Sequence, residues 1–128
     1  MNAQYKLTAG EPLRGNAAPG PIDHAHLARF TLGNRMLESE VLQLFAGHLP
    51  VTLSELRSAA SLRDWQMAAH SLKGSARAVG AWRLAQLAEE AERMPDSASP
   101  DARRSVVARV EAAAAEAGQY IGGLYPAG

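Results

Sequence analysis

The stretch DWQMAAHSLKGSARAV, residues 64–79, decides the fold because it contains one complete amphipathic helix. Its apolar residues recur at steps of three and four, which is the spacing of a helix with one buried stripe. That stripe consists of Trp65, Ala68, Ala69, Leu72, Ala76 and Val79. Asp64 is a favourable N-cap and Gly80 is a favourable stop, so we expect a helix over residues 64–79.

A short helix and a long one are expected before this stretch. The short helix begins after Asp23, a plausible N-cap, and is closed by Gly33-Asn34, two residues that tolerate a left-handed conformation. Its expected buried residues are Ile22, Leu27 and Phe30. Residues 1–20 are rich in glycine and proline without apolar periodicity, and are expected to form a flexible tail.

The long helix carries apolar residues at helical spacing up to an exit over residues 58–63. Its expected buried stripe consists of Met36, Leu37, Val41, Leu44, Phe45, Leu49, Leu53 and Leu56. Pro50 interrupts this pattern, since it lacks an N–H and its ring crowds the preceding turn. A kink is favoured over a break because the periodicity continues in phase beyond it.

Two more helices follow residue 80. The first ends at Pro95, and its stripe consists of Leu84, Leu87, Ala88, Ala91 and Met94. The second begins with Ser99 as N-cap and Pro100 at the first helical position, and frays at Gly122-Gly123. Its buried face consists of Val106, Val107, Val110, Ala113, Ala114, Ala117, Tyr120 and Ile121. The fold class is therefore all-α: an antiparallel four-helix bundle over residues 21–124, with the short N-terminal helix capping one end.

Composition excludes several classes of function. The chain has 128 residues, which suits one domain, and no cysteine for disulfides or thiolate metal sites. It has 13 Lys and Arg against 13 Asp and Glu, so it lacks the positive surplus that nucleic-acid binding needs. No apolar run approaches the roughly 20 residues of a membrane helix, so no membrane insertion is expected. We expect a cytoplasmic monomer.

The face of the helix opposite its apolar stripe is polar and cationic. Gln66, His70, Lys73, Gly74 and Arg77 recur on it at steps of three and four. Glycine in a helix interior costs about 1 kcal/mol relative to alanine, so its presence one turn from a histidine suggests clearance for another backbone.

This face suits phosphoryl transfer. A neutral imidazole is a competent nucleophile near pH 7, and His70 is expected to face solvent. Lys73 at i+3, with Arg77 a turn further on, is expected to offset the charge of an arriving phosphoryl group. Phosphoryl transfer asks a protein mainly for positioning and charge compensation, so few residues are needed.

The segment His70-Ser71-Leu72-Lys73-Gly74-Ser75 resembles the signature His-x-Leu-Lys-Gly-Ser of histidine-containing phosphotransfer (HPt) domains. The resemblance covers roughly residues 25–94, and the last helix matches only in type. Flanking residues that match the family pattern are Phe45, Leu56, Asp64, Trp65, Gly80, Ala81, Leu84, Leu87 and Glu92. Pro50 and the glycine-rich tail depart from it.

The resemblance implies a phosphorelay intermediate of a two-component system. His70 would accept a phosphoryl group on Nε2 from an aspartyl phosphate of a receiver domain, in a response regulator or a hybrid sensor histidine kinase, and pass it to a second receiver. Lys73 would assist the phosphoryl group and Gly74 would permit docking, together with Gln66 and Arg77. The resemblance implies no cofactor here, because the divalent cation belongs to the receiver, and no autonomous kinase activity.

Two alternatives stay open. A histidine kinase dimerisation-type domain also presents a histidine on a helical bundle, although there an acidic residue usually follows the histidine, where this chain has Ser71. A receiver-binding bundle could also keep the docking face without phosphotransfer chemistry. The sequence does not identify the partner kinase, the regulator, the pathway or the direction of phosphate flow. It also leaves open whether the chain is free-standing or a domain of a hybrid kinase.

Other polar residues are interpreted as structural. His24 and His26 point to different faces of a helix with no third ligand nearby, so no metal site is predicted. His48 is expected to be a partly buried structural residue. Glu89, Glu90 and Glu92 are expected to form a solvated face.

Overall fold

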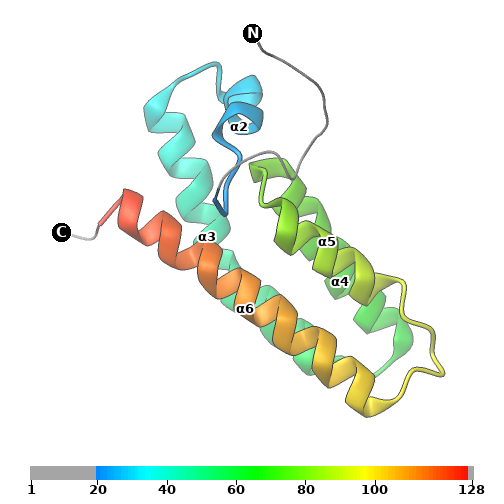
Figure 1. Ribbon diagram of the computed structural model, residues 1–128. Helices are drawn as coiled ribbons and strands as arrows, with labels where there is room; N and C mark the ends of the chain where they lie inside the picture. The colour runs from blue at the N-terminus through cyan, green and yellow to red at the C-terminus, as the bar shows by residue number, and fades with distance from the viewer. Residues whose placement is uncertain (1–19, 127–128) are drawn as a thin grey trace, which may run out of the picture.

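The computed structural model describes residues 20–126, which contain five helices and no strand. Their bounds are α2 His24–Thr31, α3 Arg35–Arg57, α4 Leu62–Val79, α5 Trp82–Glu92 and α6 Pro100–Leu124. The last four form the predicted antiparallel bundle, and α2 lies across one end of it (Figure 1). Around the bundle, α4 packs between α3 and α5, and α6 packs between α5 and α3. The tail predicted for residues 1–20 falls outside the described residues except for Gly20.

The helix α4 buries the predicted stripe in full, from Trp65 to Val79. The Trp65 indole, although buried, donates its Nε1–H to the Ala91 carbonyl of α5 at 2.6 Å. The prediction of Asp64 as N-cap is wrong: Ser61 caps the helix, and its hydroxyl accepts from the Asp64 N–H. Asp64 instead lies in the first turn, where its charge complements the positive end of the helix dipole.

The helix α3 is unbroken through Pro50, and its buried stripe matches the predicted one in part: Phe45, Leu49 and Leu56 are buried as predicted. The residues it buries are Leu42, Phe45, Leu49, Thr52 and Leu56. Met36, Leu37 and Leu44, all predicted to be buried, are 76%, 41% and 74% exposed. The sequence carries two overlapping apolar stripes, and the bundle buries the one that includes Thr52. That residue tolerates burial because its hydroxyl donates to the His48 carbonyl of the preceding turn.

The helix α2 begins at the predicted N-cap, since the Asp23 carboxylate accepts from the His26 N–H. Ile22 and Leu27 are buried as predicted. Phe30 is not; it is 64% exposed and packs edge-on against the His26 ring. The buried residue at this end of α2 is Thr31, whose hydroxyl bonds to the Leu27 carbonyl.

Asp23 also ties α2 to the turn between α4 and α5. Its second carboxylate oxygen accepts from the Trp82 indole N–H at 2.9 Å, and its backbone N–H donates to the Gly80 carbonyl. Gly80 has φ +76°, and a Cβ there would lie 2.7 Å from the Asp23 Cβ. Only glycine fits this position, so the α4–α5 turn is tight and the register between the two helices is fixed.

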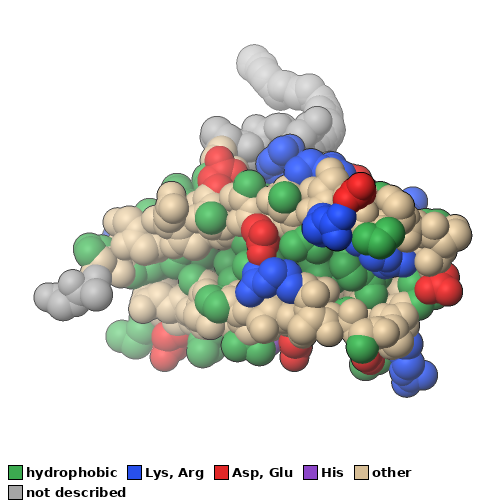
Figure 2. Space-filling view, turned by 90° about the horizontal axis from the view of Figure 1, so that it is seen from below, with side chains coloured by type: hydrophobic (Ala, Val, Ile, Leu, Met, Phe, Trp, Pro, Cys, Tyr) green, Lys and Arg blue, Asp and Glu red, His purple; other side chains and the backbone are tan. Residues whose placement is uncertain are grey.

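The helix α6 begins as predicted, with the Ser99 hydroxyl accepting from the Ala102 N–H. The predicted fraying at Gly122-Gly123 is wrong, because the helix continues to Leu124 and buries Ile121. On the face shown in Figure 2, apolar side chains fill the space between neighbouring helices, and charged side chains project outward from the helices. None of the described helices is both long and apolar enough to span a membrane.

Candidate functional site

The imidazole of His70 projects from the middle of α4, away from the core. Its side chain is 69% exposed, because it lies opposite the stripe that α4 buries. The neighbouring Gln66, Gly74 and Arg77 of the same face are also exposed. The predicted site residues therefore share one accessible surface of α4, and their functional roles stay predictions.

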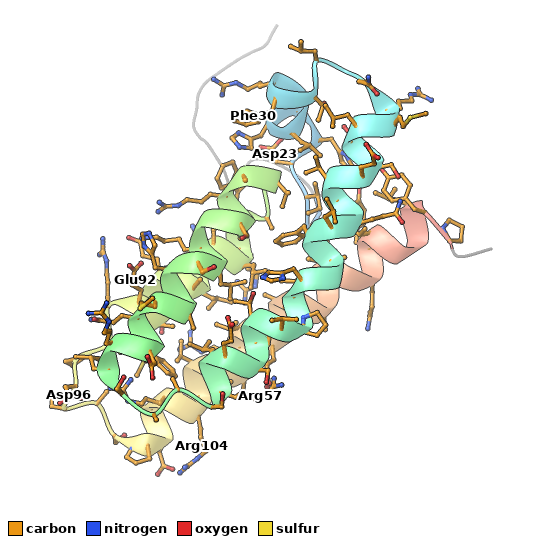
Figure 3. The ribbon with its side chains drawn as sticks, turned by 180° about the vertical axis from the view of Figure 1, so that it is seen from behind. Asp23, Phe30, Arg57, Glu92, Asp96 and Arg104 are labelled. Atoms are coloured by element: carbon orange, nitrogen blue, oxygen red, sulfur yellow. The ribbon has the colours of Figure 1, made fainter. Side chains whose placement is uncertain are left out.

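Glu92 of α5 holds the imidazole and the nearby ammonium together. Its Oε2 lies 2.9 Å from Nδ1 of His70, and its Oε1 lies 2.6 Å from Nζ of Lys73. Glu92 lies beside α4 in Figure 3. The Lys73 side chain is only 16% exposed, so its ammonium lies along the helix surface against the carboxylate.

This contact determines which ring nitrogen is free. An ionised carboxylate only accepts hydrogen bonds, so Nδ1 of His70 is the donor toward Glu92. In a neutral imidazole the lone pair is then on Nε2, the nitrogen that does not contact Glu92. The geometry thus orients the ring and gives a nucleophilic nitrogen on an exposed side chain.

The pKa of the Glu92 carboxyl is lowered from its ordinary value. The hydrogen bond from Lys73 is the main cause, partial burial opposes it, and the His70 contact lowers the pKa further. The carboxylate is therefore charged at neutral pH, as the tautomer of His70 requires.

We expect Glu92→Gln to lower the free energy of unfolding at pH 7 by about 1 kcal/mol, because Lys73 loses its charged partner. A carboxyl whose pKa is lower in the folded protein stabilises the fold above its unfolded pKa of about 4.3. This stabilisation is lost as the pH falls through the folded pKa. Denaturant unfolding of both proteins should therefore give a difference that shrinks below about pH 4.3.

The matched control is Glu116→Gln, which changes an exposed glutamate of α6. It should leave the free energy of unfolding within about 0.5 kcal/mol of the original at each pH. A Glu92→Gln difference that stayed constant down to pH 3 would contradict the assignment to the carboxylate.

Gly74 leaves open space one turn beyond His70. A Cβ built on it would meet no atom within 4 Å, apart from the backbone of its own helix. The backbone of α4 beside the imidazole is therefore accessible from outside the protein.

The two flanks of this surface differ in chemistry. On the α5 side, Glu89 contacts Arg77 at 3.1 Å and Arg93 at 2.7 Å, so this flank is charged. On the α3 side, a groove with a volume of ≈ 270 Å³ runs between α3 and α4. The residues that line it are Val41, Leu44, Phe45, His48, Leu49, Thr52, Leu72, Ser75, Ala78 and Val79. The His70 surface therefore lies between a charged flank and an apolar one.

The sequence analysis counted Glu92 among the family landmarks and expected it on a solvated face, whereas it contacts two predicted site residues. A signal for this contact was present. Antiparallel helices joined by a tight turn bring together residues equidistant from that turn. His70 precedes Gly80 by ten residues, and Glu92 follows Ala81 by eleven.

The other histidines lie apart from this site. Nε2 of His24 lies 2.6 Å from the Tyr120 hydroxyl, whereas His26 packs against Trp82, so the two point in different directions. Within residues 20–126 no group of three His, Asp or Glu side chains is placed to hold a metal ion. The prediction that His48 is partly buried is wrong, since it is exposed along the α3–α4 groove.

Comparison with known proteins gives a match to a protein family. The model of a family described as the Hpt domain matches residues 40–120, which include α4, α5 and most of α3 and α6. Neither a curated protein nor a solved structure matches the chain.

Proposed function

The chain belongs to the Hpt domain family, whose members act in phosphotransfer of two-component signalling, and we propose that His70 is its phosphoryl acceptor. The observation that carries this proposal is an exposed imidazole whose Nδ1 is held by Glu92 at 2.9 Å. Nε2 attacks the phosphorus of an aspartyl phosphate on a receiver domain. A nitrogen–phosphorus bond forms, the acyl oxygen–phosphorus bond breaks, and the receiver keeps its carboxylate. The same steps in reverse deliver the group to a second receiver.

The charges around the ring support this chemistry. The imidazole gains positive charge as the bond to phosphorus forms, and the Glu92 carboxylate at Nδ1 stabilises that charge. Lys73 is anchored next to the ring by the same carboxylate, and its other N–H groups are available to a phosphoryl oxygen. Lys73 thereby offsets the phosphoryl charge without leaving Glu92.

The two flanks support docking of a receiver domain. Gly74 lets the partner backbone approach the imidazole, and Gln66 and Arg77 contribute polar contacts beside it. The α3–α4 groove and the exposed Leu44 provide the apolar part of the interface. A relay complex must dissociate after each transfer, so we expect an interface below about 1,200 Å².

The proposal includes a cytoplasmic, monomeric protein that needs no metal or cofactor of its own, with the divalent cation held by the receiver. The receiver belongs to a response regulator or to a hybrid sensor histidine kinase. The family match supports a receiver domain as the partner, and the charge-neutral composition argues against nucleic acid.

The test is phosphotransfer profiling against phosphorylated receiver domains of the source genome. We expect at least one receiver to label the protein within seconds to minutes, and we expect no label from ATP alone. Labelling by ATP alone would favour the kinase dimerisation-type alternative. Binding of a receiver without any labelling would favour the bundle that docks but carries no chemistry.

A further inference from the structure

His48 is a polar side chain in a groove that is otherwise mainly apolar. It lies on the exposed side of α3, one turn after Leu44, and Ser75 and Ala78 are among the residues of α4 that line the same groove. The groove contains no charged side chain among its lining residues. The groove therefore differs in chemistry from the charged flank around Lys73 and Arg77.

The groove is continuous with the surface of His70. Ala78, which lines it, lies eight residues after His70, and Gly74 lies between the two at steps of four, so all three share one exposed side of α4. A partner that reaches the imidazole of His70 therefore covers the groove as well. A channel between two packed helices accepts the ridge of a third helix, so the fitting occupant is an amphipathic helix of the receiver.

The polar groups of the groove differ in whether they need a hydrogen-bond partner from this docking helix. The Thr52 hydroxyl already donates to the His48 carbonyl, and a serine hydroxyl on a helix can bond to the carbonyl of its own preceding turn. An imidazole has no such partner within its own turn, and it needs hydrogen bonds for both ring nitrogens. Covering His48 with an apolar side chain would leave those nitrogens unsatisfied.

We propose that His48 selects among receiver domains: it favours a docking helix that places a hydrogen-bonding side chain against the imidazole, and it disfavours one that is apolar there. This inference rests on the proposed function, because it assumes that a receiver docks over His70. His48 acts on docking and does not touch the transferred phosphoryl group.

The test compares His48→Leu and His48→Gln with the unchanged protein against one panel of phosphorylated receivers. With His48→Leu, transfer from the preferred receiver should slow about tenfold, as expected for one lost hydrogen bond at a partner's polar group. Receivers disfavoured by the unchanged protein should gain. His48→Gln keeps a hydrogen-bonding group and should keep the order of preference.

The matched control is Gln43→Leu, which adds the same side chain to an exposed position of α3 that does not line the groove. It should leave the order and the rates unchanged. An unchanged order with His48→Leu, or an equal change with Gln43→Leu, would overturn the inference. Both positions are exposed and leucine favours helices, so thermal unfolding should show each variant folded.

The inference and the proposed function fail in different ways. If the unchanged protein takes no phosphoryl group from any receiver, the proposed function is wrong and the inference is wrong with it. If the unchanged protein is labelled and His48→Leu shows the same profile, only the selection by His48 is wrong.

Discussion

His70→Gln should abolish phosphoryl acceptance from every receiver, with a loss of at least about 1000-fold, because it removes the nucleophile itself. A glutamine amide nitrogen has no basic lone pair and does not attack phosphorus. The side chain is 69% exposed and touches the rest of the protein mainly through Glu92, so the fold does not depend on it. Glutamine is a good helix former, and its amide N–H can still donate to Glu92.

The measurement is labelling by a phosphorylated receiver, combined with thermal unfolding. The His48→Gln variant is the matched control, since it exchanges another exposed histidine for the same residue and should still be labelled. Both variants should unfold within a few degrees of the original. Label on a folded His70→Gln protein would show that another residue is the acceptor, and the proposed function would be wrong.

The fold class and the whole of α4 were predictable because several signals agreed there. In α4 a single apolar stripe and a stop glycine indicate the same helix. Only the N-cap differs from the prediction, since it is Ser61 and not Asp64. The helix α3 carries more apolar residues than one face can bury, so periodicity alone does not decide which stripe is inside. The choice depends on how α3 is rotated about its own axis in the bundle, and in this bundle Thr52 is buried and Leu44 is exposed.

The candidate site was predictable only where its residues lie on one helix. His70, Lys73 and Gly74 share a face by spacing alone. The contact of Glu92 with His70 crosses between helices, and it depends on the register that Gly80 sets in the α4–α5 turn. The pattern of residues within one helix does not reveal how that helix is aligned with its neighbour. The position of His48 was missed for a related reason, since its exposure follows from which stripe α3 buries.

Gly74→Gln should separate stability from function by changing the two in opposite directions. Glycine in a helix interior costs about 0.5–1 kcal/mol relative to a good helix former. A Cβ at residue 74 meets no atom within 4 Å, so a larger side chain has room in the free protein. The free energy of unfolding should therefore rise by about 0.5–1 kcal/mol, measured by denaturant unfolding.

The same substitution should slow phosphotransfer about 100-fold, because the side chain stands where the receiver backbone must approach His70 and a misplacement of 1 Å is already costly. Gly74→Ala projects only one methyl group and should give a smaller loss with a similar gain in stability. If Gly74→Gln transferred phosphate at the original rate, the open space beside His70 would not be a docking site.

Gly122→Gln is the control that makes this comparison decisive. Gly122 is also a helical glycine with open space at its Cβ position, but it lies on α6, whose backbone stays apart from that of α4. It should gain stability in the same direction and leave transfer unchanged. Loss of transfer in Gly74→Gln alone would then be a property of the surface around His70, because helix propensity and side-chain size change equally in both variants.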